Sequence, residues 1–292
     1  MRIAHTDHKN NSFSQTTKFE FGNRVFEQKG PLVMGILNLT PDSFYDGGMY
    51  HDEKSILDRA IALLSEGADI IDLGAVSTRP GATMTDEATE IIRLLPVVKR
   101  LKTEFPSAIL SIDTFRTNVA KTMLDAGATM INDISGGTFD ATMAGFIGET
   151  NAPYVMMHIF REPETMQNKP MGVESVDEIF RFFDRQVELF MSKGAKQLII
   201  DPGIGFGKTV ELNYYLLAHL DRFTKYGFPI LVGLSRKSLI NKVLRTSPED
   251  ALNGTTVLNT LALMHGANIL RVHDVKEAVE ARTLCAMIMK QS

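Results

Sequence analysis

Polar residues that can hold a small charged ligand stand at the ends of short apolar runs along the whole chain. These residues are Asn38, Asp113, Asn132, His158, Asp201, Ser235, Arg271 and His273. Their carboxylate, amide, guanidinium and imidazole groups can bind an anion or the polar edge of a ring, and can stabilise charge that develops in a reaction. We therefore predict one active site, provided that the fold brings the ends of the runs together.

The runs have the length and composition of buried strands. Each carries Ile, Val or Leu at both odd and even positions, as expected of a parallel strand that is covered on both faces. They cover residues 32–38, 69–74, 108–114, 129–135, 153–158, 197–203, 229–235 and 268–274.

Amphipathic stretches of helical length fill the gaps between the runs. They cover residues 53–66, 86–104, 116–126, 140–150, 174–193, 210–226, 236–246, 251–265 and 275–290. Asp86 marks one helix start, and Ser175 with Glu178 matches a capping box at another. The repeated alternation predicts an α/β fold, the TIM (β/α)8 barrel, in which the C-terminal ends of the strands form the active site.

The residues ahead of the barrel divide into a tail and a hairpin. Residues 1–16 are predicted to be a flexible N-terminal tail, and residues 17–292 a single barrel domain. Residues 17–29 alternate apolar and polar side chains around Gly22-Asn23, which predicts a β-hairpin that caps the barrel floor. The polar start has no apolar core of a signal peptide, so we expect a cytoplasmic protein.

Composition excludes several classes of protein. The chain is 44% hydrophobic and 23% charged, without an apolar stretch of transmembrane length, which indicates a soluble globular protein. The formal net charge of −4 argues against a nucleic-acid surface. Cys285, beside Leu284 and Ala286, is predicted to be buried and reduced. No Cys/His cluster is present, so a zinc site made by the protein alone is not expected.

The glycine-rich stretch 201–209 is not a nucleotide-binding loop. The phosphate-loop pattern needs a glycine where Pro202 stands, and glycines at 203, 205 and 207 do not fit the dinucleotide spacing. The glycines are predicted to let the loop pass close to a ligand or turn sharply. Asp201 at the start of this stretch is predicted to be functional, with a helix cap or ion pair as the alternative.

Two carboxylates and an amide are predicted to converge. Ser111 and Asp113 share one parity, whereas Asn132 and Asp133 point to opposite sides, so one of this second pair faces the barrel interior. One interpretation is a glycosidase, whose two carboxyls flank a bond about 5 to 9 Å apart. The other is a receptor for a heterocycle edge with N–H donors and a carbonyl. The residues alone leave both open.

A cationic group is predicted on the other side of the same mouth. Arg271 and His273 share parity, and barrel closure places them beside the strand that ends in Asn38, which indicates an anion site. An Arg271–Asp274 ion pair is the structural alternative. Lys237 in the SRKS segment also faces negative charge, with a Schiff-base role as its alternative.

From Gly30 to about Glu280 the chain resembles dihydropteroate synthase, the pterin-binding enzyme of folate biosynthesis. Seven segments in the family's order carry the resemblance: MGILNLTPDSFYDGG (34–48), GADIIDLGAVSTRPGA (67–82), SIDT (111–114), GATMINDISGG (127–137), DPGIGFGKT (201–209), GLSRKS (233–238) and RVHDVKEAVEA (271–281). The resemblance implies condensation of 6-hydroxymethyl-7,8-dihydropterin pyrophosphate with p-aminobenzoate. It also implies Mg²⁺, a homodimer and small-molecule substrates, without nucleic-acid or membrane partners.

The resemblance also assigns roles to individual residues. Asp113, Lys237, Asp42 and Arg271 are expected to be catalytic, and the pterin is expected to contact Asp113, Asn132, Asp201, Lys237 and Arg271. Pyrophosphate is expected at Asn38, Arg79, Arg271 and His273, with Asn38 also at the metal. The p-aminobenzoate is expected to lie against Phe44, Thr78, Pro80, Lys237 and Ser238.

The chain departs from the family pattern at two places. Ala75-Val76 stand where the family usually shows Gly-Glu, and the segment IFREPETMQ follows His158 in place of the usual Met and Gly. We expect these changes to affect the loop conformations and the affinity for substrates or sulfonamides. The alternative function is a pterin-binding methyltransferase of the corrinoid-dependent kind, which would not need the TPDSF, STRPG and SRKS segments together.

Overall fold

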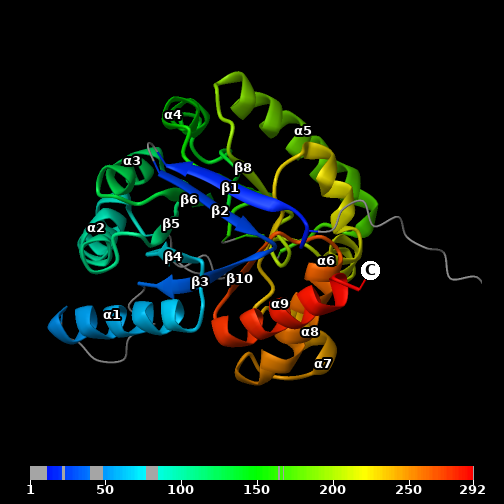
Figure 1. Ribbon diagram of the computed structural model, residues 1–292. Helices are drawn as coiled ribbons and strands as arrows, with labels where there is room; N and C mark the ends of the chain where they lie inside the picture. The colour runs from blue at the N-terminus through cyan, green and yellow to red at the C-terminus, as the bar shows by residue number, and fades with distance from the viewer. Residues whose placement is uncertain are drawn as a thin grey trace, which may run out of the picture.

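The computed structural model describes residues 12–21, 24–39, 49–76, 85–163, 165–166 and 168–291. Within these residues eight parallel strands form one sheet in the order β8-β7-β6-β5-β4-β3-β10-β9, with helices outside it (Figure 1). A parallel bridge between Ile200 and Ile230 joins the two ends of this order. The sheet therefore closes into a barrel, and the predicted TIM barrel fold is confirmed.

The barrel strands fall inside the predicted apolar runs. They are β3 (Leu32–Asn38), β4 (Ile70–Gly74), β5 (Ile109–Asp113), β6 (Met130–Asp133), β7 (Tyr154–Met157), β8 (Leu198–Asp201), β9 (Leu231–Val232) and β10 (Ile269–Val272). Alternate residues fill the interior: Leu32, Met34, Ile70, Ile109, Met130, Val155, Ile199, Leu231 and Ile269 form one buried cluster. Residues of the other parity pack under the helices, which explains why both parities are apolar.

The helices between the strands also match the prediction closely. They are α1 (Met49–Ser65), α2 (Glu87–Glu104), α3 (Thr117–Asp125), α4 (Met143–Thr150), α5 (Val176–Ser192), α6 (Val210–Ala218), α7 (Ser238–Leu244), α8 (Leu252–Met264) and α9 (Val275–Met289). Short 3-10 segments lie at Val173–Ser175, Leu220–Tyr226 and Glu249–Ala251. The single helix predicted over 210–226 is therefore wrong, because α6 ends at Ala218 and a 3-10 segment follows.

The two predicted helix starts had different outcomes. The Asp86 carboxylate accepts a hydrogen bond from the Thr89 amide at 2.9 Å, so Asp86 caps α2. The capping box predicted at Ser175 is wrong, because the Ser175 side chain makes no capping hydrogen bond. Ser175 instead closes the 3-10 turn ahead of α5, with a backbone that is not extended as a capping residue needs.

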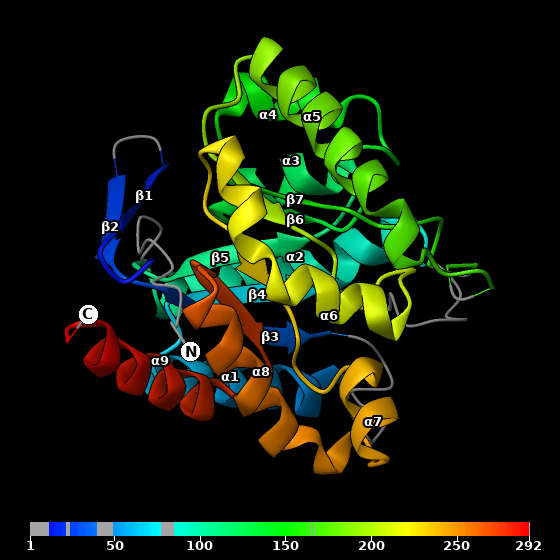
Figure 2. The same cartoon turned by 90° about the vertical axis from the view of Figure 1, so that its right-hand side faces the viewer.

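The hairpin ahead of the barrel closes the barrel floor, as predicted. Strands β1 (Thr16–Phe21) and β2 (Arg24–Lys29) pair antiparallel and lie at one end of the barrel, from which β3 points away (Figure 2). The Phe19 ring is only 2% exposed, because it packs against the lowest interior residues of the barrel. Of the expected tail, residues 1–11 lie outside the described residues. Gln15 lies within them and accepts a hydrogen bond from the Gly30 amide.

Removing the Phe19 ring is expected to destabilise the protein without disturbing the active site at the opposite end. Phe19→Ala leaves a cavity under the barrel and should lower the free energy of unfolding by about 3–5 kcal/mol, measured by urea denaturation. Val25 on the same hairpin is 57% exposed, so Val25→Ala is the matched control and should change the value by less than about 0.5 kcal/mol. Equal effects of the two variants would contradict the floor assignment.

Candidate active site

The barrel mouth is organised around Arg271, which β10 directs into the interior. Its Nε donates to Asp72 Oδ2 at 2.6 Å, and its Nη2 donates to Asp113 Oδ2 at 2.8 Å. Asn132 Nδ2 donates to the same Asp72 oxygen at 3.0 Å. Four strands, β10, β4, β5 and β6, therefore place one cation, two carboxylates and one amide in a single hydrogen-bonded group. The structure thus brings Asp113, Asn132 and Arg271 together.

Asp72 is the residue of this group that sequence reasoning missed. It lies inside the β4 run between Ile71 and Leu73, was counted as part of an apolar strand, and is fully buried. The signal was present, because a charged residue is almost never fully buried unless it is paired. In the described part of the chain its Oδ1 and the neighbouring buried Ser111 Oγ have no hydrogen-bond partner. Asp72 Oδ1 can accept a hydrogen bond from a bound molecule or water, and the Ser111 hydroxyl can either donate or accept one.

Burial dominates the charge state of Asp113. Loss of solvent raises the pKa of Asp113 to about 7, Arg271 opposes this shift, and the carboxylate of Asp72 adds to it. The pKa of Asp201 is also raised by burial, against the nearby Lys237 ammonium. Two buried carboxylates thus depend on neighbouring cations to stay ionised, which is typical of functional sites.

Lys237 lies on the opposite side of the mouth from β5 and β6. Its Nζ donates to the Ile204 carbonyl and lies 4.5 Å from the centre of the Phe206 ring. Burial lowers the pKa of Lys237 to about 8, while Asp201 acts to raise it. Asp201 Oδ1 accepts a bond from the Gly203 amide at 2.7 Å. The glycine-rich loop therefore contacts both Lys237 and Asp201.

The predicted anion site at the ends of β3 and β10 has a neutral histidine. The ring Nδ1 of His273 lies 3.0 Å from Ser235 Oγ, and burial together with Arg271 lowers the pKa of His273 to about 4. A carbon added to Gly74 would lie 3.5 Å from Asn38 Oδ1 and 3.6 Å from Asp113 Oδ2, so both oxygens face the same small space. Asn38, Asp113 and His273 therefore line one mouth.

The alternative pairing of Arg271 with Asp274 is wrong. Asp274 is bound by Arg236, whose Nη2 and Nε lie 2.8 and 3.0 Å from its two oxygens. Arg236 adopts a left-handed backbone with φ of 56°. It thus ties the loop after β9 to the loop after β10, while the next residue, Lys237, points into the barrel.

Several other residues named in the sequence analysis do not line the barrel mouth or lie outside the described residues. Asn132, and not Asp133, faces the interior; Asp133 accepts hydrogen bonds from the Tyr154 hydroxyl at 2.6 Å and from Ser135. His158 has the outward parity of β7, and its ring packs 5.0 Å from Phe182 of α5, so its predicted place in the site is wrong. Cys285 is buried and free, and Ser238 begins α7. Asp42, Phe44, Thr78, Arg79 and Pro80 lie outside the described residues.

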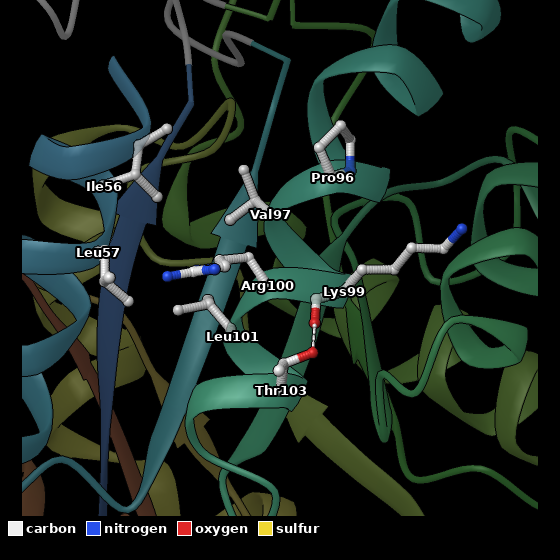
Figure 3. Close-up of a pocket in the computed structure, with 8 residues that line it drawn as sticks. All are labelled: Ile56, Leu57, Pro96, Val97, Lys99, Arg100, Leu101 and Thr103. Atoms are coloured by element: carbon white, nitrogen blue, oxygen red, sulfur yellow. Dashed lines mark hydrogen bonds between the residues drawn. The ribbon is translucent and has the colours of Figure 1, made fainter. Parts of the chain in front are cut away.

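A cavity of about 280 Å³ opens on the outer face of the barrel, between α1 and α2 (Figure 3). Its lining is Ile56, Leu57, Pro96, Val97, Lys99, Arg100, Leu101 and Thr103. None of these residues belongs to the mouth, and active sites of TIM barrels lie at the C-terminal ends of the strands. We therefore place the candidate active site at the mouth and not in this cavity.

The described residues contain no helix long and apolar enough to cross a membrane. They also contain no group of three or more His, Cys, Asp and Glu side chains that could hold a metal ion. A metal held mainly by such protein ligands is therefore not built by the part of the chain that the structure describes.

Comparison with known proteins agrees with this geometry. Residues 34–273 match the sequence profile of a family described as "Pterin binding enzyme". The dihydropteroate synthase of Synechocystis is 43% identical over 263 residues, which are 89% of this chain and 89% of that protein. The Escherichia coli dihydropteroate synthase is 40% identical over 257 residues, 86% of this chain and 89% of its own length.

Solved structures give the same result. The Yersinia pestis dihydropteroate synthase in a sulfonamide drug complex has a TM-score of 0.86 and 38% identity, and covers 94% of this chain and 100% of its own. The Xanthomonas albilineans enzyme in complex with 7,8-dihydropteroate has a TM-score of 0.82 and 34% identity, with 94% of this chain and 99% of its own covered.

The hydrogen-bonded group around Arg271 predicts how the pKa of Asp113 depends on Asp72. Asp72→Asn removes the carboxylate that raises the pKa of Asp113 and leaves Asp113 as the charged partner of Arg271, so the pKa of Asp113 should fall clearly below about 7. The measurement is a titration of the Asp113 carboxyl by ¹³C NMR. Asp58→Asn, at an exposed position of α1, is the control and should not move it. An unchanged or higher pKa in Asp72→Asn would disprove the coupling.

Proposed function

The chain belongs to the pterin-binding enzymes, among the dihydropteroate synthases of folate biosynthesis, and on this basis we propose how its own residues carry out the transfer. As a transferase of this family it condenses 6-hydroxymethyl-7,8-dihydropterin pyrophosphate with p-aminobenzoate and releases 7,8-dihydropteroate and pyrophosphate. The resemblance inferred from the seven sequence segments is confirmed. The observation that carries the residue roles is the convergence of Asp113, Asn132 and Arg271 at the barrel mouth.

The pterin ring edge is assigned to the polar layer of the barrel. Its adjacent N–H groups can donate to Asp113 and Asp201, and Asn132 can both donate and accept. Lys237 is assigned to the ring acceptors, because its ammonium is held toward Asp201 by the glycine-rich loop. Arg271 is assigned to the ring face, since its fixed guanidinium plane is suited to stacking.

Pyrophosphate is assigned to Asn38, Arg271 and His273, with Arg79 beyond the described residues. Because His273 has a pKa of about 4, its ring is neutral at pH 7 and carries one N–H. Ser235 can donate its hydroxyl to Nδ1, which places the ring proton on Nε2, where it can donate to a phosphate oxygen. Among the described residues, the pyrophosphate thus receives positive charge from Arg271 and hydrogen bonds from the neutral side chains of Asn38 and His273.

The proposed cofactor is Mg²⁺, which Asn38 would hold together with pyrophosphate oxygens. Amide and phosphate oxygens are hard ligands that suit this ion, and Mg²⁺ is usually held by few protein ligands and by its substrate. The Asn38 oxygen lies close to Gly74 and to the Asp113 carboxylate at the barrel mouth, which fits such a role. Bound Mg²⁺ supplies positive charge that neutralises the leaving pyrophosphate.

Asp113 is assigned the stabilisation of positive charge on the pterin as its C–O bond breaks. The buried carboxylate lies at the mouth, where low polarity strengthens its interaction with a developing cation. The step is then dissociative, and the weakly nucleophilic amine of p-aminobenzoate attacks late. Asp42 is assigned to order the first loop over the pyrophosphate.

The p-aminobenzoate is assigned to Phe44, Thr78, Pro80, Lys237 and Ser238. Ser238 starts α7, and its hydroxyl and the helix start can receive the substrate carboxylate. No residue needs to form a covalent bond to either substrate.

A homodimer is proposed through α8 and α9, which lie side by side on the outer face (Figures 1 and 2). Large apolar side chains are exposed along both helices: Val257, Leu261 and Met264 on α8, and Leu284, Met287 and Ile288 on α9. Their spacing places each set on one helix face. Large apolar side chains gathered on exposed helix faces are typical of protein–protein interfaces. We place the protein in the cytoplasm, with no membrane or nucleic-acid partner.

The decisive test is pyrophosphate release by the purified protein with dihydropterin pyrophosphate and Mg²⁺, with and without p-aminobenzoate. Release that requires p-aminobenzoate, with an equal amount of dihydropteroate, supports the synthase. Tight pterin binding without release would instead support the binding or methyltransferase function.

The role of Asp113 predicts a specific kinetic result. Asp113→Asn should lower kcat by roughly 100-fold or more, because charge stabilisation is lost only in the transition state. Affinity for the pterin substrate should fall much less, by about tenfold at most, since the amide can still accept one hydrogen bond. Asp125→Asn, at the exposed end of α3, is the control. Equal losses in kcat and affinity would remove the cation-stabilising role.

The proposed dimer predicts that a charged residue introduced on the exposed apolar face of α8 and α9 weakens self-association. Leu284 is 67% exposed, and Leu284→Glu should weaken self-association by more than about tenfold, measured by sedimentation velocity over a concentration series. Ile92 on α2 is 71% exposed and lies outside this face, so Ile92→Glu should leave the dimer intact. A wild-type protein that stays monomeric at all concentrations would reject the proposal.

A further inference from the structure

A buried lysine outside the assigned site joins two loops at the barrel mouth. Lys208 is 5% exposed, and its Nζ donates to the carbonyl oxygens of His158 at 3.0 Å, Gly203 at 2.8 Å and Phe206 at 3.1 Å. All three acceptors are neutral backbone groups, and an ammonium has three N–H donors to match them. Lys208 thus bridges the loop after β7 and the loop after β8.

The two loops lie so close together that only glycine fits at the contact points. Gly203 and Gly207 have φ of 67° and 66°, and a carbon added to either would overlap a carbonyl oxygen, of His158 and Phe160 respectively. Close packing brings carbonyl dipoles toward one another in a buried place. The Lys208 ammonium compensates for this repulsion, which explains a lysine at a position that an apolar residue could otherwise fill.

The loop that Lys208 holds is the one that sets both Asp201 and Lys237. Its Gly203 amide donates to Asp201, and its Ile204 carbonyl accepts from Lys237. Its Phe206 ring lies under the Lys237 ammonium. Loss of the clamp would therefore move two groups assigned to the pterin, although Lys208 itself is turned away toward the carbonyls.

Lys208 also contributes charge. Asp201 faces Lys237, Lys208 and Arg271, together with the Gly203 amide, and all four act against the burial that raises its pKa. Burial lowers the pKa of Lys208 to about 7, with Lys237 acting in the same direction and Asp201 acting to raise it.

We propose that Lys208 is a positioning residue of the transfer reaction, which clamps the loops after β7 and β8 and holds Asp201 as a carboxylate in the pterin site. The part of the proposal that concerns pterin affinity rests on the proposed function, whereas the part that concerns the charge of Asp201 can be tested on the free protein alone.

Two measurements on the variant Lys208→Met test the proposal. Met has a side chain of similar length to Lys but lacks all three N–H donors. The pKa of Asp201, followed by ¹³C NMR of its carboxyl in the free protein, should rise, because a nearby cation is lost. The affinity for dihydropterin pyrophosphate should fall by roughly tenfold or more, because bonds made by a charged donor are lost.

Two further variants separate positioning from general destabilisation. Lys208→Gln keeps two N–H donors without the charge, so it should raise the pKa of Asp201 in the same way but recover part of the pterin affinity. Lys225→Met removes a half-exposed lysine paired with Asp184 and should change neither value. If Lys208→Met shows no cooperative unfolding and is therefore not folded, the pKa of Asp201 is measured in Lys208→Gln instead.

The outcomes distinguish this proposal from the function on which it rests. An unchanged Asp201 pKa in both Lys208 variants, with or without a lower thermal midpoint, overturns the role of Lys208. Wild-type affinity in Lys208→Met overturns the clamp. A wild-type protein that binds no dihydropterin pyrophosphate contradicts the proposed function. The titration of Asp201 in the Lys208 variants would still test whether the charge of Lys208 lowers the pKa of Asp201.

Discussion

The active site depends on the ion pairs that hold Arg271 beneath the barrel mouth. A guanidinium in this position would be costly to bury alone, and Asp72 and Asp113 compensate for it with short, charge-assisted bonds. Asp72 also accepts a hydrogen bond from Asn132, so the same carboxylate fixes both Arg271 and Asn132. The polar layer is therefore preorganised by strand residues before any ligand arrives, which spares the reaction the energetic cost of reorienting dipoles.

The fold could be predicted because its causes are local and repeated. Short runs with apolar residues of both parities can hardly be anything but doubly covered strands, and their regular alternation with helices leaves few other topologies. The misjudged helix over 210–226 and the absent cap at Ser175 lie at element ends, where competing turn geometries differ by little energy. Parity directed Asp113 and Arg271 to the same side of the sheet, where they form an ion pair, since side chains alternate along a strand.

What sequence could not supply was the pairing of charges across the barrel. Asp72 looked like an interruption in an apolar strand, because its partner Arg271 lies 199 residues away and enters only on closure. His158 shows the reverse error, a polar residue at a strand end that packs among aromatic rings. The sequence offered Arg271 as a partner of Asp274, but the structure shows Arg236 bound to that carboxylate.

The strand origin of the polar layer has a consequence for how such a protein can diverge. Asp72, Asn132, Asp201 and Arg271 are anchored in the sheet, whose register fixes them independently of loop length. Changes in the connecting loops, such as Ala75-Val76 or the segment after His158, therefore alter the rim of the mouth and leave the strand register that holds this polar layer in place. Variation in the sequence is tolerated at the rim and restricted in the strands beneath it.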